Sequence, residues 1–114
     1  MGNIDKMIIY VALFSEQPEV VNVIVKRKQY ANDHCWESED RDNSPRLTYD
    51  ENWFNNGSWS YTATTKKYIE CKLSIWTNKE DATKALIHKV GEQLDIMYRQ
   101  KKKYVNFLWN NRKQ

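Results

Sequence analysis

The stretch YIECKLSIWTNKEDATKALIHKVGEQL, residues 68–94, contains the change of hydrophobic period that decides the fold. In its first part the apolar side chains stand at every second position, namely Ile69, Cys71, Leu73 and Ile75. This alternation predicts a strand with one face on a core and the other in water. Thr77 and Glu80 then have the spacing of a capping box, so we expect an α-helix to begin there, with Thr77 as its N-cap.

The helix predicted to follow covers residues 78–112 and is amphipathic. At 100° per residue, its apolar side chains fall within one arc of roughly 160°, interrupted by Lys101. Such a helix would extend roughly 50 Å, whereas five short strands offer about 20–25 Å of width. It must therefore either break near residues 100–103 and fold back, or pack on a second copy of the chain. We favour a homo-oligomer with an interface formed by Met97, Tyr104, Val105, Leu108 and Trp109.

The segment before the helix, residues 6–76, predicts about five strands connected as meanders. The runs at 6–15 and 20–32 are apolar and β-branched and flank the turn EQPE, so we expect them to pair as a hairpin. The run at 37–46 is polar and contains Pro45, which indicates a surface loop.

A second hairpin is expected between residues 46–54 and 58–65, because the NNG turn at 55–57 supplies residues that accept positive φ. The prediction is a single α+β domain over residues 1–114. In it, an antiparallel sheet of about five strands is packed by one long C-terminal amphipathic helix.

The amino-acid composition limits the classes of function that this protein can have. The net charge of +3 is low for a protein that binds duplex nucleic acid. No run approaches the roughly 18 apolar residues that a membrane span needs, so we expect no membrane partner and a cytoplasmic protein. The two cysteines, Cys35 and Cys71, have no metal-ligand spacing and are expected to be small buried hydrophobes.

Catalytic motifs are scarce, and we expect no enzyme activity, no cofactor, no metal site and no catalytic residues. His34 and Cys35 are adjacent, and neighbouring side chains on a strand point to opposite faces. With three glycines in the chain, a glycine loop that cradles phosphate is excluded. The remaining enzymatic alternative is a weak metal-dependent hydrolase that uses His34 and the carboxylates of residues 37–42.

Ligand binding is better supported, because basic residues stand among the five Trp and seven Tyr. Aromatic rings stack on bases and Lys or Arg pairs with phosphates, although the same residues can also fill a core and its rim. The ligand-binding residues that we predict are Arg46, Trp53, Trp59, Tyr61 and Lys67, together with Arg99 and Lys102 from the helix.

The strands KMIIYVALF, VVNVIVKRK and YIECKLSIW, followed by TNKEDATKALIHKVGEQL, resemble in order and character the type-one anti-Thoeris proteins of bacteriophages. Members of that family are oligomeric sponges that sequester cyclic ADP-ribose-type signals and, in some cases, cyclic oligonucleotides. The resemblance covers most of the chain as a pattern of elements, and it assigns no binding residue. It implies an anti-defence protein in the cytoplasm of an infected bacterial host.

The leading functional prediction is therefore a phage-type protein that sequesters a small cyclic nucleotide without turnover. The alternative from another class is an inhibitor of a host defence protein or CRISPR effector. Such an inhibitor would dock through the acidic segment 37–42 and imitate the charge of a nucleic acid.

Overall fold

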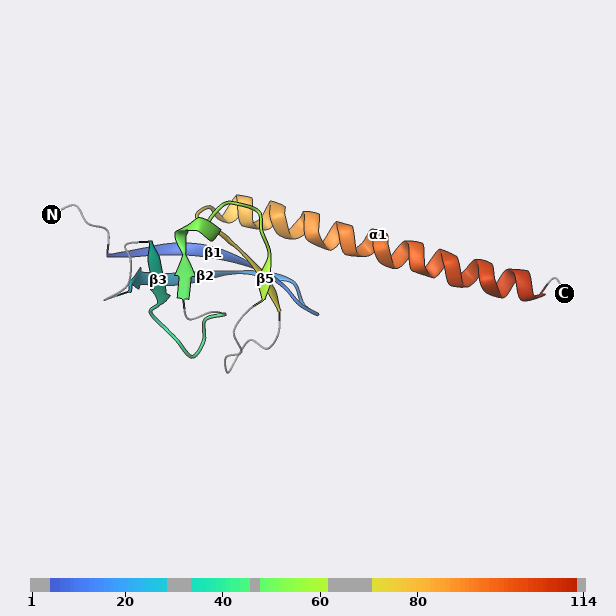
Figure 1. Cartoon of the computed structure of the whole chain (residues 1–114), viewed down its shortest axis with the longest axis horizontal. Helices are drawn as coiled ribbons and strands as arrows, with labels where there is room; N and C mark the ends of the chain where they lie inside the picture. The colour runs from blue at the N-terminus through green and yellow to red at the C-terminus, as the bar shows by residue number, and fades with distance from the viewer. Residues whose placement is uncertain (1–4, 29–33, 46–47, 62–70, 113–114) are drawn as a thin grey trace.

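The computed structural model describes residues 5–28, 34–45, 48–61 and 71–112. The molecule is 77 Å long and 26 by 20 Å across, because one helix projects far beyond a curled sheet (Figure 1). The α+β fold with an antiparallel sheet and a long C-terminal helix is confirmed. The elements in chain order are β1 (Lys6–Phe14), β2 (Glu19–Arg27), β3 (Cys35–Ser38), β4 (Thr48–Asp50), the 3-10 turn η1 (Glu51–Trp53), β5 (Ser60–Tyr61), β6 (Lys72–Trp76) and α1 (Lys79–Arg112).

The sheet has six strands in the order β4-β3-β2-β1-β6-β5, close to the five expected. The predicted first hairpin is confirmed, because β1 and β2 pair antiparallel with Ile8 opposite Ile24. β6 pairs with the other edge of β1, where Val11 lies opposite Ile75. The two longest strands and the strongly alternating strand therefore form the centre of the sheet.

The predicted second hairpin is wrong. β4 pairs with β3 and β5 pairs with β6, so the two segments lie at opposite edges of the sheet. The turn residues do have the expected positive φ, 59° at Asn55 and 77° at Gly57. However, Phe54 forms a bridge with Ile75, and the Asn55 amide donates to the Ile75 carbonyl at 2.8 Å. These contacts carry the chain across to β6 instead of back onto β4.

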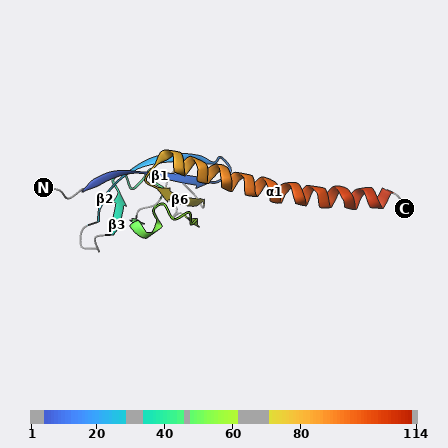
Figure 2. The same ribbon diagram turned by 90° about the horizontal axis from the view of Figure 1, so that it is seen from above.

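Over the second half of β1 the sheet is covered on both faces, whereas Ile8, nearer the start of the strand, is 51% exposed. One face curls around the main core, which consists of Ile9, Val11, Leu13, Val23, Val25, Trp36, Tyr49, Cys71, Leu73 and Ile75. On the other face Ala12 is buried against Ala82 and Leu86 of α1. Two facing alanines let the helix backbone approach the strand closely, and Figure 2 shows the start of α1 lying over the sheet.

The N-cap of α1 is Asn78, not Thr77 as predicted. The Asn78 side-chain oxygen accepts hydrogen bonds from the amides of Glu80 and Asp81, at 2.8 and 3.2 Å. Thr77 is instead held by Asn55, whose side chain donates to the Thr77 hydroxyl at 2.9 Å and accepts from the Thr77 amide at 3.0 Å. The residue before the helix thus ties it to the positive-φ turn.

We expect Asn78→Ala to lower the free energy of unfolding by about 1 kcal/mol, because two helix amides lose their acceptor. Urea unfolding followed by circular dichroism measures the change. Asn106→Ala, an exposed substitution of the same type inside α1, is the control and should change stability by less than about 0.5 kcal/mol. Equal effects at the two positions would contradict the assignment of the cap.

The helix does not break near residues 100–103, and α1 runs unbroken from Lys79 to Arg112. The segment RQKKK at 99–103 contains strong helix formers and no residue that ends a helix. Because α1 leaves the sheet after Val90, its second half packs on no other part of the chain that the structure describes. Of the two sequence-based alternatives, folding back is therefore wrong.

Candidate functional site

Of the predicted ligand-binding residues, the five that the structure describes do not gather at one place within a single copy. Trp59 packs at the base of α1 with the Lys89 ammonium 5.7 Å from its ring centre. Tyr61 is exposed on β5, with the Lys72 ammonium 5.6 Å from its ring centre. Trp53 lies on η1, partly exposed. Arg46 and Lys67 lie outside the described residues.

Arg99 and Lys102 lie on the projecting half of α1. Lys89 marks the level of Trp59, and Arg99 is ten residues further along the helix, roughly 15 Å at 1.5 Å per residue. The structure of one copy therefore brings a lysine to each of Trp59 and Tyr61, but it does not bring Arg99 or Lys102 to them.

The projecting half of α1, residues 94–110, carries many exposed apolar side chains, and we call it the free arm. Every one of its 17 residues is exposed. The five predicted interface residues all lie on it, and each has more than half of its side chain in solvent. The exposed apolar side chains that share one face, here called the apolar stripe, are Leu94, Met97, Tyr98, Tyr104, Val105, Leu108 and Trp109.

The stripe runs the length of the arm and is interrupted by Lys101. At 100° per residue its seven members span about 140° of the helix circumference. The exposed Ile87, which lies beside the sheet, extends it toward the base of α1. Leu94 and Tyr98 belong to the stripe and were not among the predicted interface residues. A spacing of seven residues could have identified Leu94, because Ile87, Leu94, Lys101 and Leu108 recur with that period.

The same seven-residue period gives a second series, Val90, Met97 and Tyr104, three residues after the first. These two series are the a and d positions of a coiled coil, with Lys101 as the one charged residue among them. An open hollow on the arm is lined by Leu94, Met97, Tyr98 and Lys101, with Asp95 at its edge. Positions i, i+3, i+4 and i+7 form the hole that receives a side chain from a facing helix. The arm therefore has the surface of one half of a helix pair.

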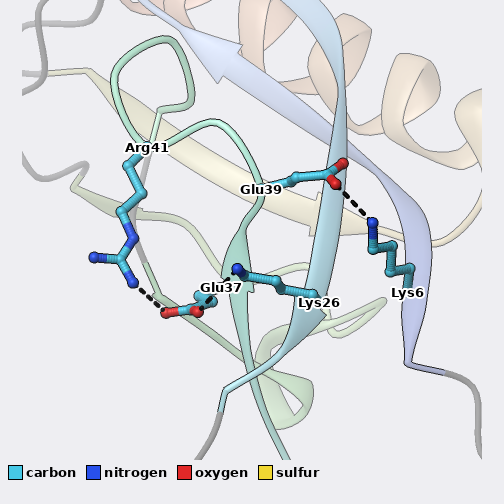
Figure 3. A network of polar contacts seen from close by, with 5 residues as sticks. All are labelled: Lys6, Lys26, Glu37, Glu39 and Arg41. Carbon is cyan, nitrogen blue, oxygen red and sulfur yellow. Dashed lines mark hydrogen bonds and ion pairs between the residues drawn. The ribbon is translucent and has the colours of Figure 1, made fainter.

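The acidic segment that was expected to dock on a partner is engaged with lysines of the sheet (Figure 3). Lys6 and Lys26 are cross-strand neighbours, and like charges placed so destabilise a sheet. The Lys6 ammonium lies 2.7 Å from Glu39, and the Lys26 ammonium lies 3.8 Å from Glu37.

Other partners complete this network. Arg41 lies 3.0 Å from Glu37, whose side chain is only 14% exposed. The hydrogen bond from Lys6 and its charge hold the pKa of Glu39 below the usual range. Two of the carboxylates expected to imitate a nucleic acid thus compensate charges of their own sheet, so a role in docking has no geometric support.

His34, the residue proposed for hydrolysis, contacts Glu51. Its Nδ1 lies 3.1 Å from one Glu51 oxygen, and the Trp36 indole donates to the other at 2.7 Å. Within residues 5–28, 34–45, 48–61 and 71–112, no three His, Cys, Asp or Glu side chains gather as metal ligands would. The positive role of Glu51 is to anchor the buried Trp36.

The hydrogen bond from Trp36, followed by that from His34, holds the pKa of Glu51 below the usual value of 4.5. The contribution of Glu51 to stability is therefore complete above pH 4.5 and is lost as the pH falls through its lower folded pKa. We expect the free energy of unfolding to fall on acidification below pH 4.5. Urea titrations at several pH values should show a shallower fall for Glu51→Gln, and parallel curves would contradict this.

No helix within the described ranges is both long enough and apolar enough to cross a membrane. No protein-family model matches the chain, and no curated protein or solved structure matches it.

Proposed function

We propose that this protein is a non-enzymatic binding protein that assembles from identical copies through the free arm of α1 and holds its ligand by stoichiometric association. The observation that carries this proposal is the apolar stripe on an arm whose 17 residues are all exposed. Contiguous apolar surface of this kind marks interaction sites in proteins.

The helical state of the free arm supports the same inference. Most helical stability in proteins comes from packing an amphipathic face and not from intrinsic propensity. The free arm has no such packing from the described part of its own chain. It also contains Tyr98, Tyr104 and Val105, which are weaker helix formers than Ala or Leu. A partner helix along the stripe supplies the packing that keeps the arm helical.

A second copy is an adequate partner by area. A large side chain covers about 150–250 Å², and the seven members of the stripe are 51–68% exposed, so the stripe offers on the order of 700 Å² per copy. A standard stable interface buries about 800 Å² per partner. The arm of each copy therefore approaches what a stable pair requires before any polar rim is counted.

The charge of the arm does not select a different partner. Its basic residues outnumber the single carboxylate, Asp95, which at first favours an acidic helix as the partner. However, at 100° per residue Arg99 and Lys103 lie on the side of the helix opposite the stripe, and Lys102 lies just outside its edge, beside Trp109. Only Lys101 lies within the stripe, so most of the charge remains in solvent when two arms pair.

The ligand class that we propose is the one implied by the resemblance to anti-Thoeris proteins, a small cyclic nucleotide in the cytoplasm of an infected bacterial host. Two contacts in the sheet domain support it. Lys72 lies over Tyr61 and Lys89 over Trp59, so each ring has a cation beside it. Such pairs are suited to a base and its phosphate. Without turnover, one assembly would hold a fixed number of nucleotides.

Native mass spectrometry of the freshly purified protein tests both the assembly and the nucleotide ligand. We expect discrete oligomers of the 13.7 kDa chain, with additional mass in nucleotide-sized steps. Oligomers without additional mass would contradict the nucleotide ligand and leave a host defence protein as the proposed target. A bare monomer would contradict the assembly itself.

A further inference from the structure

We propose that two copies pair through their free arms as an antiparallel coiled coil in one register. In this register Lys101 of each copy faces Tyr104 of the second copy, and Met97 faces Leu108 of the second copy. The inference rests on the proposed assembly and adds its direction and alignment. Both follow from the placement of Lys101 and from the length of the arm.

Direction follows from Lys101. In a parallel pair the equivalent a positions face each other, so Lys101 would meet Lys101 of the second copy inside the seam. Two ammonium groups that face each other inside the seam repel strongly, because little water is present there to screen their charges. In an antiparallel pair an a position faces a d position of the other helix. Lys101 then faces an aromatic ring or a thioether instead of lying directly opposite Lys101 of the second copy.

Register follows from the arm's length. Registers that keep the a and d series in contact differ by one heptad. Sliding the helices together by one heptad places Leu108 of the second copy opposite Val90, which already packs against its own sheet. Sliding them apart by one heptad leaves Leu94 and Met97 beyond the partner's helix, which ends at Arg112. The register between these two covers the whole arm and keeps the second copy's helix away from the sheet.

In that register the seam is chemically consistent. The Lys101 stem packs along the apolar stripe, and its ammonium lies by the phenol ring of Tyr104 of the second copy, as in a cation–π pair. Tyr98 flanks the seam beside Val105 of the second copy. Every contact occurs twice, because a two-fold axis relates the copies.

The pair would hold two sheet domains at opposite ends of a short rod. The two Val90 residues, after which α1 leaves each sheet, are separated by about 25 helical positions, or roughly 37 Å at 1.5 Å per residue. Each sheet domain keeps its own Tyr61 and Trp59 surfaces exposed to solvent or ligand, away from the seam. The assembly is therefore bivalent.

Cysteine cross-linking distinguishes the arrangements. Met97→Cys and Leu108→Cys are made as single variants of the full chain, at side chains that are 62% and 60% exposed and so not needed for the fold of one copy. The two variants are co-expressed with tags of different size and treated with a mild oxidant. The wild-type chain, which keeps Cys35 and the buried Cys71, measures background cross-linking.

We expect a cross-linked band only for the mixed pair that carries one variant on each chain. In the proposed register the two Met97 positions are roughly 16 Å apart. A disulfide needs Cα atoms within about 7 Å, so Met97→Cys alone should not cross-link. Efficient cross-linking of each single variant with itself would show a parallel pair and would overturn this inference while leaving the assembly intact.

No cross-link in any combination would also overturn it. Sedimentation of the wild-type chain then separates the two failures. A wild-type dimer would mean that the arms pair in another register, whereas a wild-type monomer would mean that the proposed assembly fails as well.

Discussion

Changing Met97 and Leu108 together to Glu should convert the assembly into a monomer and leave the sheet domain folded. The two positions face each other in the proposed pair, so four carboxylates would enter the seam, where the two Lys101 ammonium groups can offset at most two of them. An unpaired charge in a dry interface costs several kcal/mol. At 1.4 kcal/mol for each factor of ten, we expect the dissociation constant to rise at least about a thousandfold.

The matched control is Asn106→Glu with Asn110→Glu. It makes the same change of net charge on exposed positions of the same arm, on the side away from the stripe. Light scattering coupled to size exclusion reads the mass of each variant, and circular dichroism checks the fold. An assembly that survives the Met97 and Leu108 changes, or that is lost equally in the control, would contradict the role of the stripe.

Trp36→Ala should cause the largest loss of stability within one copy. Trp36 is 2% exposed in the main core, Arg27 lies 4.8 Å from its ring centre, and its indole donates to Glu51. Removing a buried Trp side chain costs about 3–5 kcal/mol from transfer and cavity terms. That is a large part of the roughly 5–15 kcal/mol that stabilises a typical domain.

The comparison is made in the Met97→Glu/Leu108→Glu background, because self-association would add a concentration-dependent term to the free energy of unfolding. Urea unfolding followed by tryptophan fluorescence and circular dichroism measures the change. Trp53→Ala, at a partly exposed ring on η1, is the control and should cost less than about 1 kcal/mol. Similar losses for the two variants would show that Trp36 does not anchor the core.

The centre of this fold could be predicted because its residues obey local rules. The alternation up to Ile75 and the helical period after Lys79 require only the spacing of side chains in the sequence. The edges could not be predicted in this way. The NNG turn reveals positive φ, but the bridge from Phe54 to Ile75 decides which strand follows, and that contact joins distant residues. The N-cap was predicted one residue too early for a similar reason, because the Thr77 hydroxyl accepts a hydrogen bond from Asn55, which is distant in sequence.

The candidate site was harder to predict than the fold. The overhang of the helix follows from its length, and it led to the predicted interface residues on the free arm. To predict the ligand-binding residues correctly, one must know the direction in which α1 crosses β1. The spacing of residues in the sequence does not contain that direction. That direction leaves Arg99 on the arm and brings Lys89 to Trp59. Likewise, the ion pair between Lys6 and Glu39 joins residues 33 positions apart and was not predictable from either one.

We propose that the free arm of α1 is the interface between copies. Sedimentation velocity of the full wild-type chain over a wide concentration series tests this role of the arm. We expect a concentration-dependent shift to a species with twice the 13.7 kDa chain mass and an elongated shape. A single species of 13.7 kDa at every concentration would contradict it, and the apolar stripe would then belong to a different partner.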